Sequence, residues 1–247
     1  MAEPLRAHLV CGGKYHDFDY ARVELLKHLG EDPDVRTEVA SDYRDLDALA
    51  RADFLVTYTC DVRPSPEQEE ALAEFVAGGR RWLALHGTNA FLDFTARGVA
   101  APRAHPLLAS VLGSQFLAHP PIQPYRVTVA DPNHPLVEGV SPFDADDELY
   151  LCELHGELHV LLETRFSGEV PGFVEASWPG IAPHPVMYLH PYERGAVLYL
   201  TLGHCRGRWD MRPVMQEYPR VERCSWQLPV YHELLRRGLR WAARGAA

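Results

Sequence analysis

Residues 54–87 read FLVTYTCDVRPSPEQEEALAEFVAGGRRWLALHG, and this stretch decides the fold. It begins with an apolar run of strand length, residues 54–59, and ends with a second one, residues 82–85. Between the two runs, Ser65-Pro66-Glu67-Gln68 supplies an N-cap, a proline at the first helical position and the glutamine of a capping box. The helix opened by this motif stops at two glycines, and its apolar face consists of Leu72, Phe75 and Val76. The order strand, helix, strand predicts a right-handed crossover between parallel strands of one sheet.

The amino-terminal segments repeat the same pattern. Residues 5–11 form a short apolar strand that ends at Gly12-Gly13, and residues 35–40 form the next predicted strand. Between them a predicted helix stops at Gly30, and its apolar residues recur at helical spacing as Tyr20, Val23, Leu26 and Leu29. Apolar strands that alternate with helices predict a doubly wound, mostly parallel sheet covered on both faces.

The carboxyl-terminal half is richer in strand patterns. Residues 93–124 hold only short helical pieces, such as 107–112, between glycines and prolines. Strands are predicted at 125–130, 158–164, 186–190 and 196–202. A last amphipathic helix places six residues on one face: Tyr231, Leu234, Leu235, Gly238, Trp241 and Ala242. We therefore predict a single α/β domain over residues 1–247, with an extra β-rich excursion in its second half.

The composition argues against nucleic-acid and membrane partners. The 34 acidic residues against 24 basic ones give a formal net charge of -10, which argues against a nucleic-acid partner. No apolar stretch reaches the roughly 20 residues of a membrane helix, and residues 1–6 lack the features of a signal peptide. We therefore expect a soluble cytoplasmic protein with no membrane partner. The oligomeric state stays open, with a homo-oligomer as one option.

The five cysteines are odd in number and include no C-x-x-C pair. This pattern predicts neither a disulfide framework nor a cysteine zinc site. Cys60 ends a predicted strand, but no activating histidine can be assigned to it. We expect it to be a buried thiol rather than a nucleophile.

Polar groups follow four of the predicted strands. In open α/β sheets, ligands bind beyond the carboxyl ends of the strands. The four loops there hold Lys14, His16 and Asp17; Cys60, Asp61 and Arg63; His86 and Asn89; and His204, Cys205 and Arg206. Each loop contains a histidine or a cysteine, so we predict a functional site at this edge.

His86 is the main candidate within that site. It stands between a strand and Gly87, which resembles the position of a nucleophile elbow, and its neutral imidazole can act as a base near pH 7. The alternative is a histidine that caps the next turn. His204 ends another strand in the same way, with a backbone-bonded buried histidine as its alternative. Glu148 and Tyr150 would point to the same side if they lie in a strand, and the carboxylate could orient a histidine.

The other histidines are weaker candidates for the functional site. His155 and His159 are four residues apart, but Gly156 breaks the helix that would join them, so a zinc site is not expected there. Five histidines precede a proline and are typical of turns: His105, His119, His134, His184 and His190.

A set of short motifs in a fixed order resembles a known family. The motifs are GSQFLAHPP (113–121), VTVADPNHPL (127–136), DELY (147–150), HPV (184–186) and GH (203–204). Segments 13–17, 85–87 and 238–242 fit the same pattern. Together they resemble the trehalose-utilisation (ThuA-like) family over nearly the whole chain.

This resemblance implies a class I glutamine amidotransferase-like, flavodoxin-like sheet. It also implies a role in carbohydrate catabolism, on sugars or glycosides oxidised at carbon 3. Glutaminase chemistry is not expected, because amidotransferase relatives place a cysteine at the elbow where this chain has His86. The resemblance implies that His119 and His184 are also candidate site residues.

The resulting hypothesis is acid–base chemistry at carbon 2 of a 3-keto sugar, by a hydrolase, a lyase or an isomerase. His86 or His204 would be the base, Glu148 would orient it, and Tyr150 or Lys14 would stabilise the enolate oxygen. The predicted substrate-binding residues are Lys14, His16, Asp17, Asp61, Asn89, His119 and His184.

Two alternatives remain. One is a metal-dependent hydrolase with His16, His86 and His204 as ligands of a divalent metal, the one cofactor that the sequence suggests. The other is a non-catalytic sugar-binding module that stacks sugars on Trp82, Trp178, Trp209 and Trp226.

Overall fold

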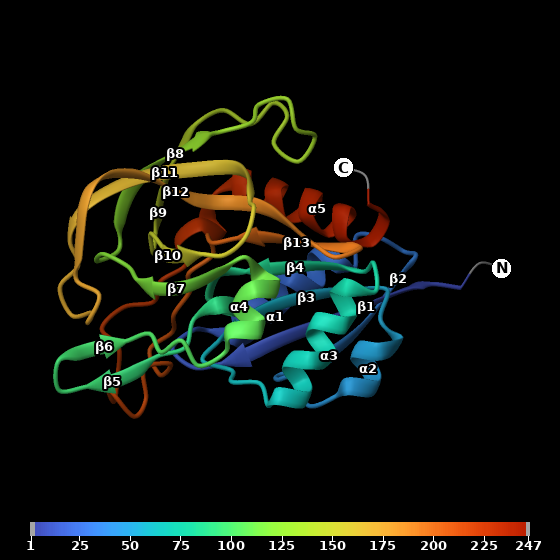
Figure 1. Cartoon of the computed structure of the whole chain (residues 1–247), viewed down its shortest axis with the longest axis horizontal. Coiled ribbons are helices and arrows are strands. Elements are labelled where there is room, and N and C mark those ends of the chain that lie inside the picture. The colour runs from blue at the N-terminus through green and yellow to red at the C-terminus, as the bar shows by residue number, and fades with distance from the viewer. Residues whose placement is uncertain (1–2, 246–247) are drawn as a thin grey trace.

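A nine-stranded sheet runs through the computed structural model, which describes residues 3–245 (Figure 1). The strand order is β2-β1-β3-β4-β13-β12-β11-β8-β9. The first two residues of the amino-terminal segment and the last two residues of the predicted domain lie outside the described residues.

One half of the sheet is parallel. It contains β2 (Val35–Ala40), β1 (Leu5–Gly13), β3 (Phe54–Cys60), β4 (Arg81–Leu85) and β13 (Gly195–Leu200), and each strand is parallel to its neighbour. Every residue of β3 is buried, as expected for a strand that helices cover on both faces. The prediction of an α/β fold is confirmed.

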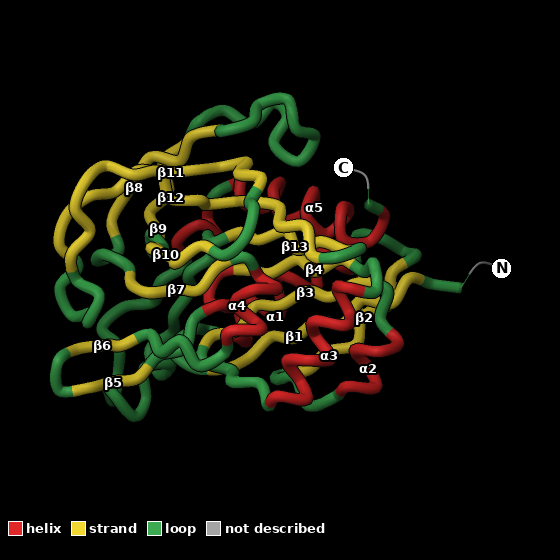
Figure 2. Tube along the Cα trace, viewed as in Figure 1, coloured by secondary structure: helices red, strands yellow, loops and turns green. Residues whose placement is uncertain are grey.

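Helices cover both faces of this half (Figure 2). One face carries α1 (Phe18–Leu29) and α5 (Pro229–Arg244), and the other carries α2 (Leu46–Arg51), α3 (Pro66–Ala77) and α4 (Pro106–Leu112). The predicted capping box opens α3: the Ser65 side chain accepts from the Gln68 backbone, and the Gln68 side chain accepts from the Ser65 backbone. The local signals therefore placed this helix correctly.

The other half continues the same sheet with antiparallel strands. They are β12 (Ser177–Tyr192), β11 (His159–Glu169), β8 (Gln123–Val129) and β9 (Phe143–Asp147). Two small sheets stand beside it: β7 (Ser114–Ala118) pairs with β10 (Leu151–Leu154), and β5 (Asp93–Thr95) pairs with β6 (Gly98–Ala100). The predicted β-rich second half is thus mostly an extension of the main sheet.

The helix α1 buries a different face from the one that its large apolar residues suggest. Val23 and Leu26 are 52% and 37% exposed, whereas Ala21, Leu25 and Leu29 are buried. The buried residues follow a four-residue spacing, so they form one stripe along the helix. All three belong to the main core.

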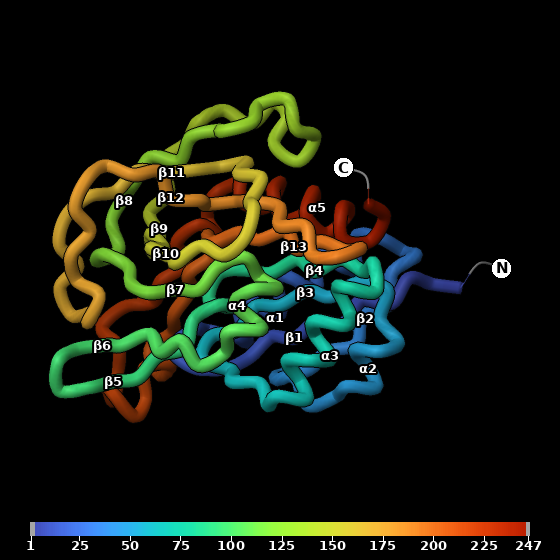
Figure 3. The backbone as a smooth tube through the Cα atoms, in the orientation of Figure 1, coloured from blue at the N-terminus to red at the C-terminus, as the bar shows by residue number. Residues whose placement is uncertain are grey.

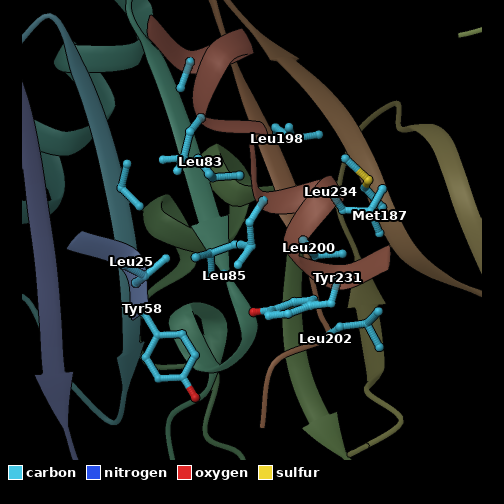
Figure 4. Packing of buried hydrophobic residues seen from close by; sticks show 14 of the residues in the cluster. Leu25, Tyr58, Leu83, Leu85, Met187, Leu198, Leu200, Leu202, Tyr231 and Leu234 are labelled. Carbon is cyan, nitrogen blue, oxygen red and sulfur yellow. The ribbon is translucent and has the colours of Figure 1, made fainter. Parts of the chain in front are cut away.

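The main core lies between the sheet and the helices α1 and α5 (Figure 4). Leu83, Leu85, Leu198 and Leu200 from β4 and β13 pack there with residues of both helices. Trp82 and Trp226 are also buried, so the expectation that they stack on a sugar is wrong. Among the described residues, no helix is long and apolar enough to cross a membrane.

Candidate metal centre at the carboxyl edge of the sheet

Four buried side chains from four loops meet beyond the strand ends. His16 follows β1, His86 begins the 3₁₀ turn η1 (His86–Asn89) after β4, Glu148 follows β9, and His204 follows β13. One nitrogen or oxygen atom from each lies within 4.8 Å of those of the other three. The structure therefore brings together three histidines and one carboxylate that are far apart in the sequence.

A strained turn aims His86 into this cluster. His86 has a φ of 46°, a left-handed conformation that is uncommon for a residue with a side chain. The Tyr199 hydroxyl donates to the His86 carbonyl oxygen at 2.6 Å and accepts from the Asn89 backbone N–H at 3.0 Å. A Cβ atom on Gly87 would lie 2.6 Å from the Thr59 carbonyl oxygen, so only glycine fits there. The turn thus has the sharp, elbow-like geometry that the sequence suggests.

Asp147 joins the loop of Glu148 to the loop of His204. Its Oδ1 accepts from the backbone N–H of Glu148 at 2.7 Å and of His204 at 3.1 Å, and its Oδ2 accepts from that of Gly203 at 2.9 Å. The strand β9 ends at Asp147, so strand alternation does not align Glu148 with Tyr150, yet both side chains approach His86 Nε2, at 3.5 Å and 3.3 Å. A buried carboxylate that binds several backbone donors holds Glu148 in place instead.

Each histidine of the cluster has one ring nitrogen bound to an acceptor outside the cluster. His86 Nδ1 lies 2.8 Å from the Thr201 carbonyl oxygen, and His16 Nδ1 lies 3.2 Å from the Lys14 carbonyl oxygen. His204 Nε2 lies 3.0 Å from Glu222 Oε2. Because carbonyl and carboxylate oxygens only accept, these three nitrogens carry the hydrogens.

The Nε2 atoms of His16 and His86 therefore turn bare lone pairs toward each other. His16 Nε2 and His86 Nε2 are 2.9 Å apart. His204 Nδ1 lies 3.1 Å from Glu148 Oε1, yet it is a buried atom without a directed hydrogen bond among the described residues. Such an arrangement is repulsive unless a positive charge lies among these atoms.

The electrostatics favour a cation other than a proton on His16. Burial, followed by the nearby His86 and His204, lowers the pKa of His16 well below its usual value. Burial alone would raise the pKa of Glu148, but His119 and His204 hold it well below its usual value. Glu148 is therefore a carboxylate beside bare imidazole nitrogens.

His204 lies between two carboxylates, Glu148 at Nδ1 and Glu222 at Nε2. Burial would lower the pKa of His204, but Glu148 and Glu222 outweigh it and raise the pKa. Burial likewise would raise the pKa of Glu222, but hydrogen bonds from His204 and Arg220 lower it to about 2. Glu222 thus fixes the orientation of the His204 ring and keeps Nδ1 directed at the cluster.

These four residues fit a divalent metal ion. Histidines that bind metals usually donate their other ring N–H to a carbonyl or a carboxylate, as all three do here. Two ring nitrogens that bind one ion at about 2.0–2.1 Å lie roughly 3 Å apart at ordinary bond angles. Three imidazoles with one carboxylate suit first-row ions such as Zn²⁺ or Mn²⁺.

Four other predicted residues lie at or beside the cluster. The Tyr150 hydroxyl lies 3.3 Å from His86 Nε2, and burial raises the pKa of Tyr150 well above its usual value, so it is a neutral phenol. His119 Nε2 lies 3.5 Å from Glu148 Oε1. Lys14 and Asp61 bind each other at 2.7 Å beside His16.

Three predicted substrate-binding residues make their contacts elsewhere. Asp17 caps α1 and pairs with Arg223 at 2.8 Å. Asn89 donates to the Ser114 hydroxyl at 2.7 Å, and the ring of His184 packs beside Trp178 on β12. Among the described residues, none of these three side chains makes a hydrogen bond or ion pair with the cluster.

The structure adds Glu222, which no sequence motif identified, and it brings in Arg206 from one of the four strand-end loops. Glu222 binds His204, and the Arg206 guanidinium lies 3.4 Å from both Glu148 Oε1 and Glu222 Oε2. Glu222 stands in an irregular segment with no periodicity or motif, so no local signal identifies it. Burial raises the pKa of Cys60 well above its usual value, in line with its expected role as a buried thiol.

The discounted histidines lie apart from the centre. His155 and His159 pair with Glu153 and Asp131 rather than with each other. Of the His-Pro group, His105 binds Glu69 at 2.6 Å and His190 binds backbone carbonyl oxygens.

The fold and the site define a class: an α/β protein whose parallel strands end in a buried cluster of histidines and a glutamate. More particularly, the chain belongs to the ThuA family, described as trehalose utilisation, whose model matches residues 7–218. The predicted family membership is confirmed. No curated protein matches the sequence.

Solved structures share the fold. A ThuA-like protein from Parabacteroides merdae is 16% identical, with a TM-score of 0.65 over 99% of this chain and 91% of that one. A ThuA-like protein from Bacteroides uniformis is 15% identical, with a TM-score of 0.68 over 100% and 95%. A β-galactosidase from Rahnella sp. R3 is 15% identical, with a TM-score of 0.57 over 97% of this chain and 31% of that one.

Proposed function

We propose that this protein is a metal-assisted acid–base enzyme that acts on a sugar or glycoside carrying a ketone at carbon 3. The observation that carries the proposal is the convergence of three buried imidazoles on the Glu148 carboxylate, with the bare Nε2 atoms of His16 and His86 facing each other. The family's link to trehalose utilisation supports the carbohydrate substrate.

The chemistry follows from the acidity of a carbon next to a ketone. A divalent ion held by His16, His86, His204 and Glu148 would polarise the ketone oxygen. Tyr150 is a neutral phenol that can donate a hydrogen bond to the oxygen of the developing enolate. Positioned proton transfer contributes roughly 10²–10⁴-fold in rate. Loss of the anomeric substituent makes the enzyme a lyase or hydrolase, and return of the proton to the other face makes it an isomerase.

The metal changes the roles that the sequence suggests for His86 and His204. A ring nitrogen whose lone pair binds a metal ion cannot accept a proton at the same time. In this proposal the two histidines are ligands, and the base is another group. If no metal binds, His86 or His204 remains the base.

The proposal also covers the detailed fold of the protein, its domain count and its location in the cell. The order β2-β1-β3-β4-β13 supports a flavodoxin-like arrangement of the class I glutamine amidotransferase type. The continuous sheet supports a single domain, and His86 at the elbow argues against glutaminase activity. We place the protein in the cytoplasm.

The test combines metal analysis with a substrate panel. Purified protein is analysed for bound metal and incubated with methyl 3-keto-α-glucopyranoside and with methyl α-glucopyranoside, before and after chelation. We expect one metal ion per chain and turnover of the oxidised glycoside alone. Chelation should abolish turnover, and added Zn²⁺ or Mn²⁺ should restore it.

Two results would contradict different parts of the proposed function. Full turnover by metal-free protein would leave the histidine-only acid–base mechanism. Binding of the glycosides without any product would favour the non-catalytic sugar-binding module.

A further inference from the structure

We infer that His119 is the residue that exchanges the proton with the substrate, beside the three histidines that hold the metal. This inference rests on the proposed function. His119 stands at the end of β7, in the loop that leads to β8, and belongs to a different segment from each of the four cluster residues.

The hydrogen bonds of His119 leave a basic nitrogen facing the centre. Its Nδ1 lies 2.8 Å from the Pro120 carbonyl oxygen, so Nδ1 carries the hydrogen. Nε2 is therefore bare, and it lies 3.5 Å from Glu148 Oε1. Nε2 is not among the atoms that lie within 4.8 Å of one another in the cluster. His119 is thus next to the centre without being part of it.

His119 is also the most exposed of the four histidines near Glu148. Its side chain is 23% exposed, whereas the side chains of His86 and His204 are at most 1% exposed. A base must come within hydrogen-bond reach of the proton that it removes. Among the four histidines near Glu148, only His119 combines a bare nitrogen with this exposure.

The β5–β6 hairpin and the turn between β11 and β12 approach each other (Figure 3). The β5–β6 hairpin contacts the turn between β11 and β12, where the Val99 N–H donates to the Gly172 carbonyl oxygen at 2.8 Å. The Phe173 ring of that turn packs edge-on against His119, with 4.9 Å between ring centres. Phe116 lies on the β7 side at 6.0 Å. These two aromatic contacts hold the imidazole in one orientation.

Other groups near Glu148 are poorer bases. Tyr150 is a buried phenol with a raised pKa, so it donates rather than accepts a proton. Arg206 is positively charged and binds both Glu148 and Glu222. The proton acceptor that the metal ligands cannot supply is therefore assigned to His119.

The proposed step balances without an oxidant or reductant. The bond between carbon 2 and its hydrogen breaks, an N–H bond forms at His119 Nε2, and the electron pair remains in the enolate of carbons 2 and 3. The enolate then restores the ketone and forms the double bond between carbons 1 and 2. The bond from carbon 1 to the glycosidic oxygen breaks with its electron pair, and that oxygen takes the proton from His119. The products are an unsaturated ketose derivative and an alcohol.

The experiment compares His119→Gln and His119→Gly with His134→Gln. His134 is a matched control because it also precedes a proline and lies apart from the centre. Metal content is measured for each purified variant. Exchange of the carbon 2 hydrogen of methyl 3-keto-α-glucopyranoside with D₂O is followed by NMR.

We expect every variant to keep one metal ion per chain. The exchange rate should fall by roughly 10²–10⁴-fold in both His119 variants and stay unchanged in His134→Gln. Added imidazole should restore part of the rate in His119→Gly, because a small base can enter the space of the missing ring. A merely structural role for His119 would not produce this rescue.

Two results would overturn the inference. One is an exchange rate in His119→Gln close to that of the unchanged protein, and the other is loss of the metal from the His119 variants, which would make His119 a ligand. Failure of the proposed function looks different: the unchanged, metal-loaded protein would then show neither exchange nor turnover.

Discussion

The Nε2 atoms of His16 and His86 lie 2.9 Å apart, although 70 residues separate the two histidines in the sequence. Both rings donate their Nδ1 hydrogen to a backbone carbonyl oxygen, so two lone pairs face each other. A proton on His16 would relieve the repulsion, but burial lowers the pKa of His16. A metal ion bound by both nitrogens removes the repulsion without a proton on His16. We therefore interpret His16 and His86 as two of the four ligands of a metal centre.

Replacing either of these histidines should abolish metal binding. In His86→Gln, the ion loses a nitrogen ligand, and we expect the affinity for Zn²⁺ to fall at least 100-fold by titration calorimetry. Added Zn²⁺ should raise the Tm of the unchanged protein but not of the variant, since a ligand at 100 times its Kd stabilises by about 2.7 kcal/mol. His159→Gln should behave like the unchanged protein, because His159 pairs with Asp131 apart from the centre. Equal Zn²⁺ affinity in His86→Gln would contradict the assignment.

Glu222 should tune the metal site without touching the metal. In Glu222→Gln, the carboxylate that accepts from His204 Nε2 is replaced by a neutral amide. Loss of such an outer partner typically costs 10–100-fold in metal affinity, and we expect a decrease of about this size for Zn²⁺. Glu217→Gln is the matched control, because Glu217 pairs with exposed Arg208 in the same segment. Unchanged affinity in Glu222→Gln would mean that His204 needs no carboxylate to hold its ring.

Asp147→Asn should lower both stability and metal affinity. The amide has one acceptor oxygen, whereas the Asp147 carboxylate uses both of its oxygens to bind backbone N–H groups from two loops. Leaving buried donors unpaired costs about 1–3 kcal/mol, and we expect that loss in urea unfolding of the metal-free protein. The neighbouring Asp146→Asn, at an exposed position, should change little. An equal effect of the two substitutions would rule out the role of Asp147 in joining the loops.

His8 should make the fold less stable in acid. It lies on β1, its Nδ1 is buried without a partner among the described residues, and burial lowers its pKa despite the nearby Asp45 and Glu38. A lowered folded-state pKa means that the unfolded chain takes up a proton first, near pH 6.5. The stabilising contribution is therefore complete above that pH and is lost as the pH falls below it, by at most about 1.4 kcal/mol per pH unit.

The measurement for His8 is the free energy of unfolding in urea at about pH 7.5 and about pH 5.5. His8→Leu cannot be protonated, so it should lose less stability between the two pH values than the unchanged protein. The difference of the two losses isolates His8 from the other histidines. If both proteins lose the same amount, His8 has an ordinary pKa.

Local patterns predicted most of the parallel half of the fold. The apolar strands, the glycine stops and the capping box at Ser65 depend on residues close in sequence, so they could be recognised without tertiary contacts. The strand β9, with the sequence FDADD, was not predicted because its polar residues form a strand only by pairing with β8. The buried face of α1, formed by Ala21, Leu25 and Leu29, was likewise decided by packing in the main core.

Local apolar patterns predicted the strand ends and, with them, three histidines at the edge of the sheet. Parallel strands end together, so His16, His86 and His204 had to gather there. Contacts between distant segments set the rest: which ring nitrogens are bare, the orientation of His204 by Glu222, and the positions of His119 beside Glu148 and of His184 against Trp178. The physical reason is that strand ends follow from local apolar patterns, whereas the protonation of a ring nitrogen depends on an acceptor supplied by a distant segment.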